Sequence, residues 1–203
     1  MIAKWILCAV FGYLLGSISA SIIISKGKYF IDIRRQGSGN AGATNMARVH
    51  GLSAGLATLA IDMAKTAVAG GLGYLLCSVP GLQVACVFCL IGHCFPVYYS
   101  LRGGKGISVC GCIALLLDWR MFLILIAVFL VVALLSRRVS LASVICALVY
   151  APVYCLLGHK SDRLGLALCI FEAALVLFQH RGNISRLIRG TEEPMTFKKD
   201  RKE

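Results

Sequence analysis

Charged residues are scarce in this chain: they make up 15% of its 203 residues, against about 25% in an average soluble domain. Negatively charged residues are scarcer than positively charged ones, with 9 Asp and Glu against 21 Lys and Arg. Hydrophobic residues make up 59%, and the mean hydropathy is +0.82. This balance argues against a soluble enzyme and against a nucleic-acid partner. It predicts an all-α integral membrane protein, with residues 1–203 forming a single domain.

Metal and nucleotide motifs are also missing. Only one C-x-x-C pair, Cys86 and Cys89, occurs among the ten cysteines, and it lies inside an apolar run without a second pair. We therefore expect no metal site and no cofactor. A nucleotide P-loop is excluded as well, because Gly rather than Ser or Thr follows Lys105.

Apolar segments predict how the chain crosses the membrane. The segments are residues 5–24, 52–76, 82–101, 107–117, 121–136, 140–157 and 164–179. The first is expected to be one retained helix, and the fourth falls short of the about 20 residues that a bilayer core requires. If the fourth crosses, sixteen Lys and Arg lie on one side and four on the other; otherwise the split is ten to ten. The positive-inside rule therefore predicts a seven-transmembrane-helix bundle, N-terminus outside and C-terminus cytoplasmic. A basic tail, 193–203, is expected to be mobile.

A glycine-rich turn interrupts the apolar pattern between the third and fourth segments. Gly103 and Gly104 precede Lys105, and Gly106 follows it. Residues without Cβ atoms let backbone N–H groups converge on an anion. The apolar segment that starts at once would place these groups at a helix N-terminus, which favours phosphate. A flexible turn that carries a basic residue at the lipid surface is the simpler alternative.

Two other polar stretches have a similar character. Residues 34–48 mix glycines with hydroxyl, amide and guanidinium groups, which suit a phosphate and a polyol, although a tight surface loop is the alternative. In residues 179–192, His180 and Asn183 are about one helical turn apart, and arginines follow them. There the alternative is an interfacial basic helix.

Three ionisable residues lie inside apolar segments. Asp62 and Lys65 are three residues apart on one helix face, so we expect them to pair with each other or to face a polar cleft. A structural ion pair and a proton relay are both open. Glu172 lies in the last segment, and Lys65 is a conceivable partner.

Taken together, these stretches resemble a known family. G-S-G-N-x-G-x-T-N-x-x-R (Gly37–Arg48), G-H-x-F-P…G-G-K-G (Gly92–Gly106) and H-R-x-N-I-x-R-L-x-x-G-x-E (His180–Glu192) occur in this order. They resemble the three signature motifs of the bacterial acyl-phosphate-dependent glycerol-3-phosphate acyltransferases. Asp62-x-x-Lys65 is similar to that family's L-D-x-x-K, and the likeness covers essentially the whole chain. Ser108 stands beside a position where members carry Thr, which leaves the role of that hydroxyl open.

The resemblance implies a multi-pass enzyme of the bacterial cell membrane with its active site at the cytoplasmic face. It would transfer a fatty acyl group from a long-chain acyl phosphate to the 1-hydroxyl of glycerol 3-phosphate. The products would be lysophosphatidate and inorganic phosphate, in the first step of phospholipid synthesis. Its partners would be these substrates and membrane lipids, and the chain is expected to function as a monomer.

Site residues follow from the same resemblance, position by position. The implied catalytic residues are Ser38, Arg48, Lys105, His180 and Asn183. The implied substrate-binding residues are Gly39, Asn40, Thr44, Asn45, His93, Gly103, Gly104, Arg181 and Arg186. The general base stays open between His93, His180 and a phosphate oxygen of the substrate.

Other functions are less consistent with the sequence. No His is followed five residues later by Asp, so the H-x-x-x-x-D dyad of soluble-type acyltransferases is missing, and no acyl-CoA or carrier-protein domain is visible. A small transporter or flippase for a phosphorylated solute or lipid is the main alternative. Transporters of this size often contain internal repeats, and none is evident here. A purely structural membrane subunit would not explain three polar stretches on one side.

Overall fold

The computed structural model describes residues 2–195, and every regular element in that range is a helix. The α-helices are α1 (Ile2–Gly16), α2 (Ala20–Tyr29), α3 (Ala43–His50), α4 (Leu52–Cys94), α5 (Ile107–Leu117), α6 (Trp119–Ser136), α7 (Val139–Leu156), α8 (Arg163–Gln179) and α9 (Arg181–Ile188). Short 3-10 helices are η1 (Ile33–Arg35), η2 (Val97–Tyr99) and η3 (His159–Ser161). The all-α prediction is confirmed for this range. Most of the tail expected at 193–203 lies outside the described residues.

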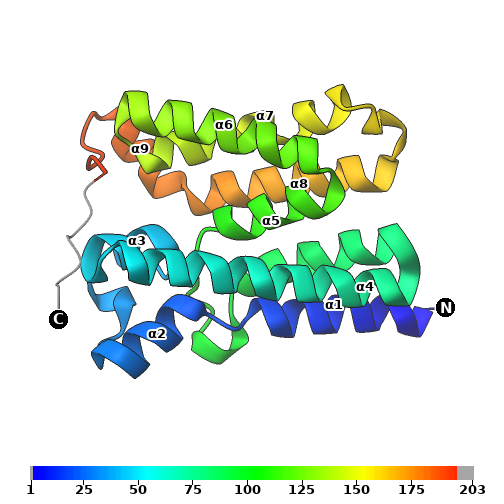
Figure 1. Cartoon of the computed structure of the whole chain (residues 1–203), viewed down its shortest axis with the longest axis horizontal. Helices are drawn as coiled ribbons and strands as arrows, with labels where there is room; N and C mark the ends of the chain where they lie inside the picture. Colours follow the sequence, from blue (N-terminus) through cyan, green and yellow to red (C-terminus); the bar gives the residue numbers. More distant parts are fainter. Residues whose placement is uncertain (1, 196–203) are drawn as a thin grey trace.

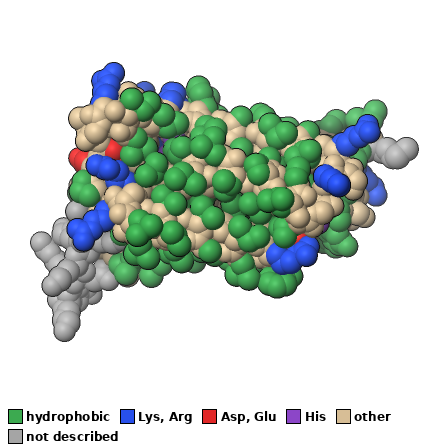
Figure 2. All heavy atoms as spheres, turned by 90° about the horizontal axis from the view of Figure 1, so that it is seen from above, with side chains coloured by type: hydrophobic (Ala, Val, Ile, Leu, Met, Phe, Trp, Pro, Cys, Tyr) green, Lys and Arg blue, Asp and Glu red, His purple; other side chains and the backbone are tan. Residues whose placement is uncertain are grey.

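Long apolar helices and a hydrophobic surface over the middle of the molecule show that this is an integral membrane protein. Four stretches are long and apolar enough to cross a bilayer: Ile2–Tyr29, Leu52–Tyr99, Trp119–Ser136 and Val139–Leu156. Counting α8 and α9 as one span bent by 61° gives up to five, by length and composition. Figure 2 shows hydrophobic side chains over the middle of the molecule and Lys and Arg toward its two ends. That distribution matches a hydrocarbon core flanked by polar interfaces.

The helices run side by side in two groups (Figure 1). One group pairs α1 with α4, and the other contains α5, α6, α7 and α8; α4 joins them through contacts with α5 and α8. At one end of the bundle lie α2, α3, α9 and the residues that follow α9 as far as 195. The N-terminus and the connection between α7 and α8 lie at the opposite end. The first and third polar stretches are therefore at the same end.

The long helix α4 reverses direction near its middle. Cys77 and Ser78 have non-helical backbone angles, with φ of 54° at Ser78. The chain then folds back so closely that a Cβ added to Gly73 would lie 2.3 Å from the carbonyl oxygen of Gly81. Two helical halves lie on either side of this break, as predicted from the separate apolar segments 52–76 and 82–101.

The expectation of one continuous first helix over 5–24 is wrong. Helix α1 ends at Gly16 and α2 begins at Ala20, which leaves carbonyl groups without their helical N–H partners. The buried ammonium group of Lys65 takes over this role, because its Nζ donates to the carbonyl oxygens of Gly16 at 3.0 Å and Ile18 at 2.6 Å. A charge inside the span thus stabilises a break in a neighbouring helix.

Small residues allow α1 to approach α4. Gly12 and Gly16 are four apart on one face, and a Cβ added to either would lie 2.3 Å or 2.1 Å from the carbonyl oxygens of Ala85 and Cys89. Apolar side chains gain little by leaving lipid for protein, so close backbone packing of this kind is what favours helix association in a bilayer. It fixes the framework on which the polar end of the bundle is built.

Candidate active site

The first polar stretch folds around the side chain of Asn45, which is 1% exposed. Its Oδ1 accepts a hydrogen bond from the Ser38 N–H at 2.9 Å. Its Nδ2 donates to the carbonyl oxygens of Gln36 and Asn40, both at 3.0 Å. These polar atoms of Asn45 form hydrogen bonds within the loop. Asn45 thus shapes the loop, and it also lines the cavity described next.

Five predicted residues of this stretch line a cavity: Ser38, Asn40, Thr44, Asn45 and Arg48. Arg48 lies in the last turn of α3, and its Nη1 is 3.8 Å from Oε2 of Glu193. Its Nε is buried without a hydrogen-bond partner among residues 2–195, so part of this guanidinium is unpaired. Gly39 instead forms the turn, with φ of 73° and its N–H on the carbonyl of Gln36. Within the described chain, Gly39 is not part of the cavity wall.

Two N–H groups of the glycine turn donate to backbone carbonyl oxygens. Gly103 donates its N–H to the Cys94 carbonyl at 3.2 Å, and Gly104 donates to the His93 carbonyl at 3.1 Å. The prediction that these two N–H groups are free for phosphate is therefore wrong. Gly104 is needed for a steric reason, because a Cβ there would lie 2.2 Å from Nε2 of His93.

The N-terminus of α5 provides the backbone N–H donors that were expected from Gly103 and Gly104. Gly106 precedes the helix in a left-handed conformation, with φ of 89°, and Ile107 and Ser108 follow it in the cavity wall. The first N–H groups of a helix have no intrahelical acceptor, and the positive end of the dipole lies there. The expected helix N-terminus beside Lys105 is confirmed, with its donors starting beyond the two glycines.

Lys105 is held by a chain of hydrogen bonds across the two remaining polar stretches. Its Nζ donates to Oδ1 of Asn183. Nδ2 of Asn183 donates to Oε1 of Glu192 at 2.7 Å, and Nε of Arg186 donates to Oε2 of the same carboxylate at 2.7 Å. Charge-assisted bonds of this length are strong and directional. They fix Lys105 and Arg186 on the same side of the cavity.

Burial changes the titration of this cluster. It lowers the pKa of Lys105 to about 8; Glu192 counteracts this shift, and Arg186 and Arg48 add to it. Burial raises the pKa of Glu192, but hydrogen bonds from Asn183 and Arg186 outweigh it, so the carboxyl titrates below its usual range. Around the cavity, the side chains of Lys105, Arg48 and Arg186 thus face the carboxyl groups of Glu192 and Glu193.

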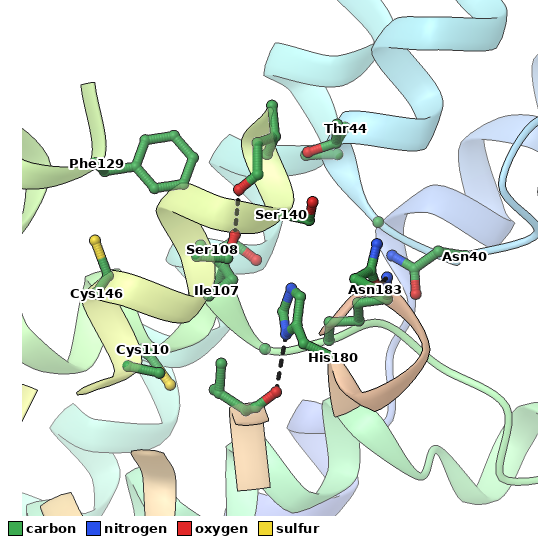
Figure 3. A pocket seen from close by; sticks show the side chains of 18 of the residues that line it. Asn40, Thr44, Ile107, Ser108, Cys110, Phe129, Ser140, Cys146, His180 and Asn183 are labelled. Atoms are coloured by element: carbon green, nitrogen blue, oxygen red, sulfur yellow. Dashed lines mark hydrogen bonds between the residues drawn. The ribbon is translucent and has the colours of Figure 1, made fainter. Parts of the chain in front are cut away.

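The two predicted histidines line the same cavity. Nδ1 of His180 is 2.8 Å from the carbonyl oxygen of Val176 (Figure 3). Nδ1 of His93 is 3.1 Å from Nζ of Lys65 and 3.6 Å from Oδ1 of Asp62. The expected pairing of Asp62 with Lys65 is confirmed, at 2.9 Å.

Glu172 remains apart from this network. It is 2% exposed, and its Oε2 has no hydrogen-bond partner among the described residues. The described partners of the Lys65 ammonium are Asp62, His93 and the two carbonyls, so the conceivable pairing of Lys65 with Glu172 does not occur there.

The cavity has a volume of about 620 Å³ and joins two different environments. Its polar end is formed by the residues described above. Its apolar part is lined by Leu59, Met63, Phe122, Leu125, Ile126, Phe129, Ala147 and Val176. Figure 3 shows His180, Asn183 and Asn40 together on one side, with Phe129 and Cys146 across from them. The arrangement suits a ligand with an anionic head and an apolar chain.

A second, more open hollow adjoins this cavity and contains three further predicted residues. Gly103, Gly104 and Arg181 line it together with Lys105 and Arg186. The Arg181 guanidinium lies 4.3 Å from the ring centre of Phe178 and donates to its carbonyl oxygen at 2.9 Å. Arg181 therefore belongs to the rim, and the main cavity is lined without it.

Glu192 is the site residue to which the sequence reading gave no role. It orders Asn183 and Arg186, and its backbone oxygen accepts from Nε of Arg138 at 3.2 Å. A signal existed, because Glu192 closes the third motif as a single carboxylate among arginines. Such a residue in a basic segment is a natural counter-ion.

Fold and site together define a membrane-embedded protein whose cavity suits an anionic amphipathic ligand, and comparison with known proteins gives its family. Residues 6–190 match the family model described as glycerol-3-phosphate acyltransferase. The glycerol-3-phosphate acyltransferase of Finegoldia magna is 42% identical over 193 residues, covering 94% of this chain and 96% of that protein. The enzyme of Geobacillus kaustophilus is 40% identical over 186 residues, covering 92% and 93%.

Comparison with solved structures gives the same family. The glycerol 3-phosphate form of PlsY (YgiH), an integral membrane glycerol 3-phosphate acyltransferase, is 29% identical with a TM-score of 0.88, covering 95% of this chain and 96% of that one. Its lysophosphatidic acid form is 28% identical with a TM-score of 0.85, covering 94% of each chain. This chain belongs to the glycerol-3-phosphate acyltransferase family. The family and enzyme class expected from the three motifs are confirmed.

Proposed function

We propose that this chain transfers an acyl group from a long-chain acyl phosphate to the 1-hydroxyl of glycerol 3-phosphate. The products are lysophosphatidate and inorganic phosphate. Family membership supplies the enzyme class and the acceptor. The two similar PlsY structures are described as glycerol 3-phosphate and lysophosphatidic acid forms. The observation that carries the proposal is the single cavity in which a cationic cluster adjoins an apolar wall.

Orientation and charge screening are the main tasks of such a site. An acyl phosphate is a mixed anhydride with a good leaving group, so direct attack by the acceptor hydroxyl needs no covalent enzyme intermediate. Both substrates are anions, and the enzyme must hold them together while charge moves to the leaving phosphate. Lys105, Arg48 and Arg186 lie around one cavity and supply that positive charge.

Roles for single residues follow from their positions. Ser38, Arg48 and Lys105 hold the glycerol phosphate. His180 and Asn183 contact the acyl phosphate, with N–H groups of the α5 N-terminus in place of Gly103 and Gly104. Asn40 and Thr44 contribute polar groups to the same wall.

The proposed donor can be tested with purified protein. Labelled glycerol 3-phosphate is incubated with palmitoyl phosphate or with palmitoyl-CoA, and labelled lysophosphatidate is measured. We expect product with palmitoyl phosphate alone, and equal rates with palmitoyl-CoA would refute the donor assignment. A parallel assay in sealed vesicles tests the transporter alternative, because uptake of label without lysophosphatidate would support transport.

We also propose that the chain is one domain with seven crossings, its N-terminus outside and its site at the cytoplasmic face. Nε2 of His159, between α7 and α8, is 2.9 Å from Oδ2 of Asp118 at the end of α5. Nε2 of Gln83, just beyond the break in α4, donates to Oδ2 of Asp162 at 2.6 Å. The break in α4 and the end of α5 therefore meet the α7–α8 connection at one end of the bundle, which supports a full crossing by the short α5.

Cysteine labelling can test this topology in a variant whose native cysteines are replaced. Single cysteines at Arg102 and Arg189 should react with an impermeant reagent from the cytoplasmic side only. A cysteine at Lys160 should react from the outside. Labelling of Arg102 and Lys160 from the same side would refute the seven-crossing arrangement.

A further inference from the structure

The buried ammonium group of Lys65 has four polar neighbours for its three N–H bonds. Lys65 is 7% exposed, and its Nζ donates to the Gly16 and Ile18 carbonyl oxygens. Oδ1 of Asp62 lies 2.9 Å away as an ion-pair partner but accepts no hydrogen bond among the described residues, which leaves the third N–H for Nδ1 of His93. A carboxylate and two carbonyl dipoles stabilise the charged form of an amine in a buried site. Lys65 is therefore an ammonium ion with donors and no acceptor.

That charge decides which nitrogen of His93 is protonated. Nδ1 of His93 lies 3.1 Å from Nζ of Lys65, within hydrogen-bonding distance. Oδ1 of Asp62 is 3.6 Å from the same Nδ1, too far for a hydrogen bond to compete. An ammonium group only donates, so Nδ1 must accept with its lone pair. A neutral imidazole whose Nδ1 accepts carries its proton on Nε2.

The Nε2 side of His93 lies against the glycine turn. A Cβ added to Gly104 would lie 2.2 Å from Nε2, and His93 itself lines the main cavity beside Lys105. His180 has the opposite arrangement, because its Nδ1 lies 2.8 Å from a carbonyl oxygen, which only accepts. The proton of a neutral His180 is thus on Nδ1, and its Nε2 holds a lone pair.

We propose that the buried Asp62–Lys65 pair fixes His93 in its Nε2–H tautomer, so that His93 donates a hydrogen bond to a substrate oxygen and does not act as general base. Asp62 and Lys65 are positioning residues in this scheme, because they act through His93. That the acceptor is a phosphate or acyl oxygen rests on the proposed function. The proton acceptors left for the attacking hydroxyl are Nε2 of His180 and a phosphate oxygen.

Nitrogen NMR tests the tautomer directly. The whole chain is labelled with ring-15N histidine in detergent, and the His93 signals are assigned among the four histidines by their loss in His93→Gln. We expect a protonated Nε2 and an unprotonated Nδ1 at neutral pH. In the Asp62→Leu/Lys65→Met double variant, which removes both charges together, the two tautomers should mix. A protonated Nδ1 in the wild-type protein would overturn the proposal.

Kinetics test the function of the tautomer. The Gln amide can donate from near the position of Nε2 but cannot serve as a base, whereas Phe can do neither. We expect His93→Gln to lose less than about tenfold in kcat/KM and His93→Phe to lose more, since general base catalysis is worth about 100-fold or more. A loss above tenfold in His93→Gln would contradict a donor role.

The two measurements separate this proposal from the proposed function. If the wild-type protein forms no lysophosphatidate, the acyltransferase assignment fails, and the NMR result still decides the tautomer. If activity is present and His93 carries its proton on Nδ1, only the assignment of Asp62, Lys65 and His93 fails.

Discussion

Replacing Lys105 with Ala removes the cation that the structure places most centrally. The lysine lies between the glycine turn and α9, and its Nζ is bound to Asn183. Burial disfavours the charged form of this lysine and lowers its pKa to about 8. A site that keeps a lysine charged at this cost is expected to use the charge on its ligand.

The size of the effect follows from the repulsion between the two substrates. Two unit charges 4 Å apart repel by roughly 4 kcal/mol at an effective dielectric of about 20. Arg48 and Arg186 remain in the variant, so only part of the screening is lost. We therefore expect Lys105→Ala to reduce kcat/KM by at least about 100-fold, or roughly 2.7 kcal/mol. Lys105→Arg should restore only part of this, because a planar guanidinium does not replace a compact ammonium group.

Phosphate release by purified variants is the appropriate assay, together with a thermal unfolding measurement to show that the fold is kept. Lys160→Ala is the matched control, because this exposed lysine lies in η3 at the opposite end of the bundle. It should behave as wild type. If Lys105→Ala keeps more than about a third of wild-type kcat/KM, a change below roughly 0.7 kcal/mol, then Lys105 does not bind the phosphate groups.

Three further predictions concern the same site. Because the pKa of Lys105 is lowered to about 8 and only its protonated form is a cation, kcat/KM should fall as pH rises through about 8, and Lys105→Arg should shift this alkaline limb upward; an unchanged limb would contradict the assignment. Glu192→Gln should reduce kcat/KM by about tenfold or more, because Asn183 loses a charged acceptor; a neutral effect in a steady-state assay would show that this contact does not order the site. Gly104→Ala should destabilise the fold, because its Cβ would meet His93 and a backbone oxygen, whereas Gly71→Ala, in open space, should not; equal melting temperatures would refute this packing argument.

Much of the architecture could be predicted because membrane helices leave a strong signal in composition. The boundaries of α6, α7 and α8, the reversal of α4 and the helix beginning at Ile107 all followed from where apolar runs stop. The break between α1 and α2 could not be predicted in this way. It lies inside an apolar run, and it is stabilised by Lys65, which is 47 and 49 residues away from its acceptors.

The site was predicted more accurately at the level of residues than of atoms. The three motifs identified Lys105, Asn183 and Arg186, which the structure brings together. They could not show that the N–H groups of Gly103 and Gly104 donate to backbone carbonyl oxygens, because hydrogen-bond partners depend on the folded loop. For the same reason, the motifs assign Asn45 and Asn40 the same role, and only the fold shows that Asn45 also orders the loop.

Direct transfer between two bound anions is the central claim of this account, and single-turnover kinetics tests it. Enzyme in excess is mixed with limiting palmitoyl phosphate, with or without glycerol 3-phosphate, and phosphate and lysophosphatidate are quantified together. The account predicts that phosphate appears only when glycerol 3-phosphate is present and in equal amount to lysophosphatidate. Rapid phosphate release without the acceptor, leaving acyl groups bound to the protein, would contradict it.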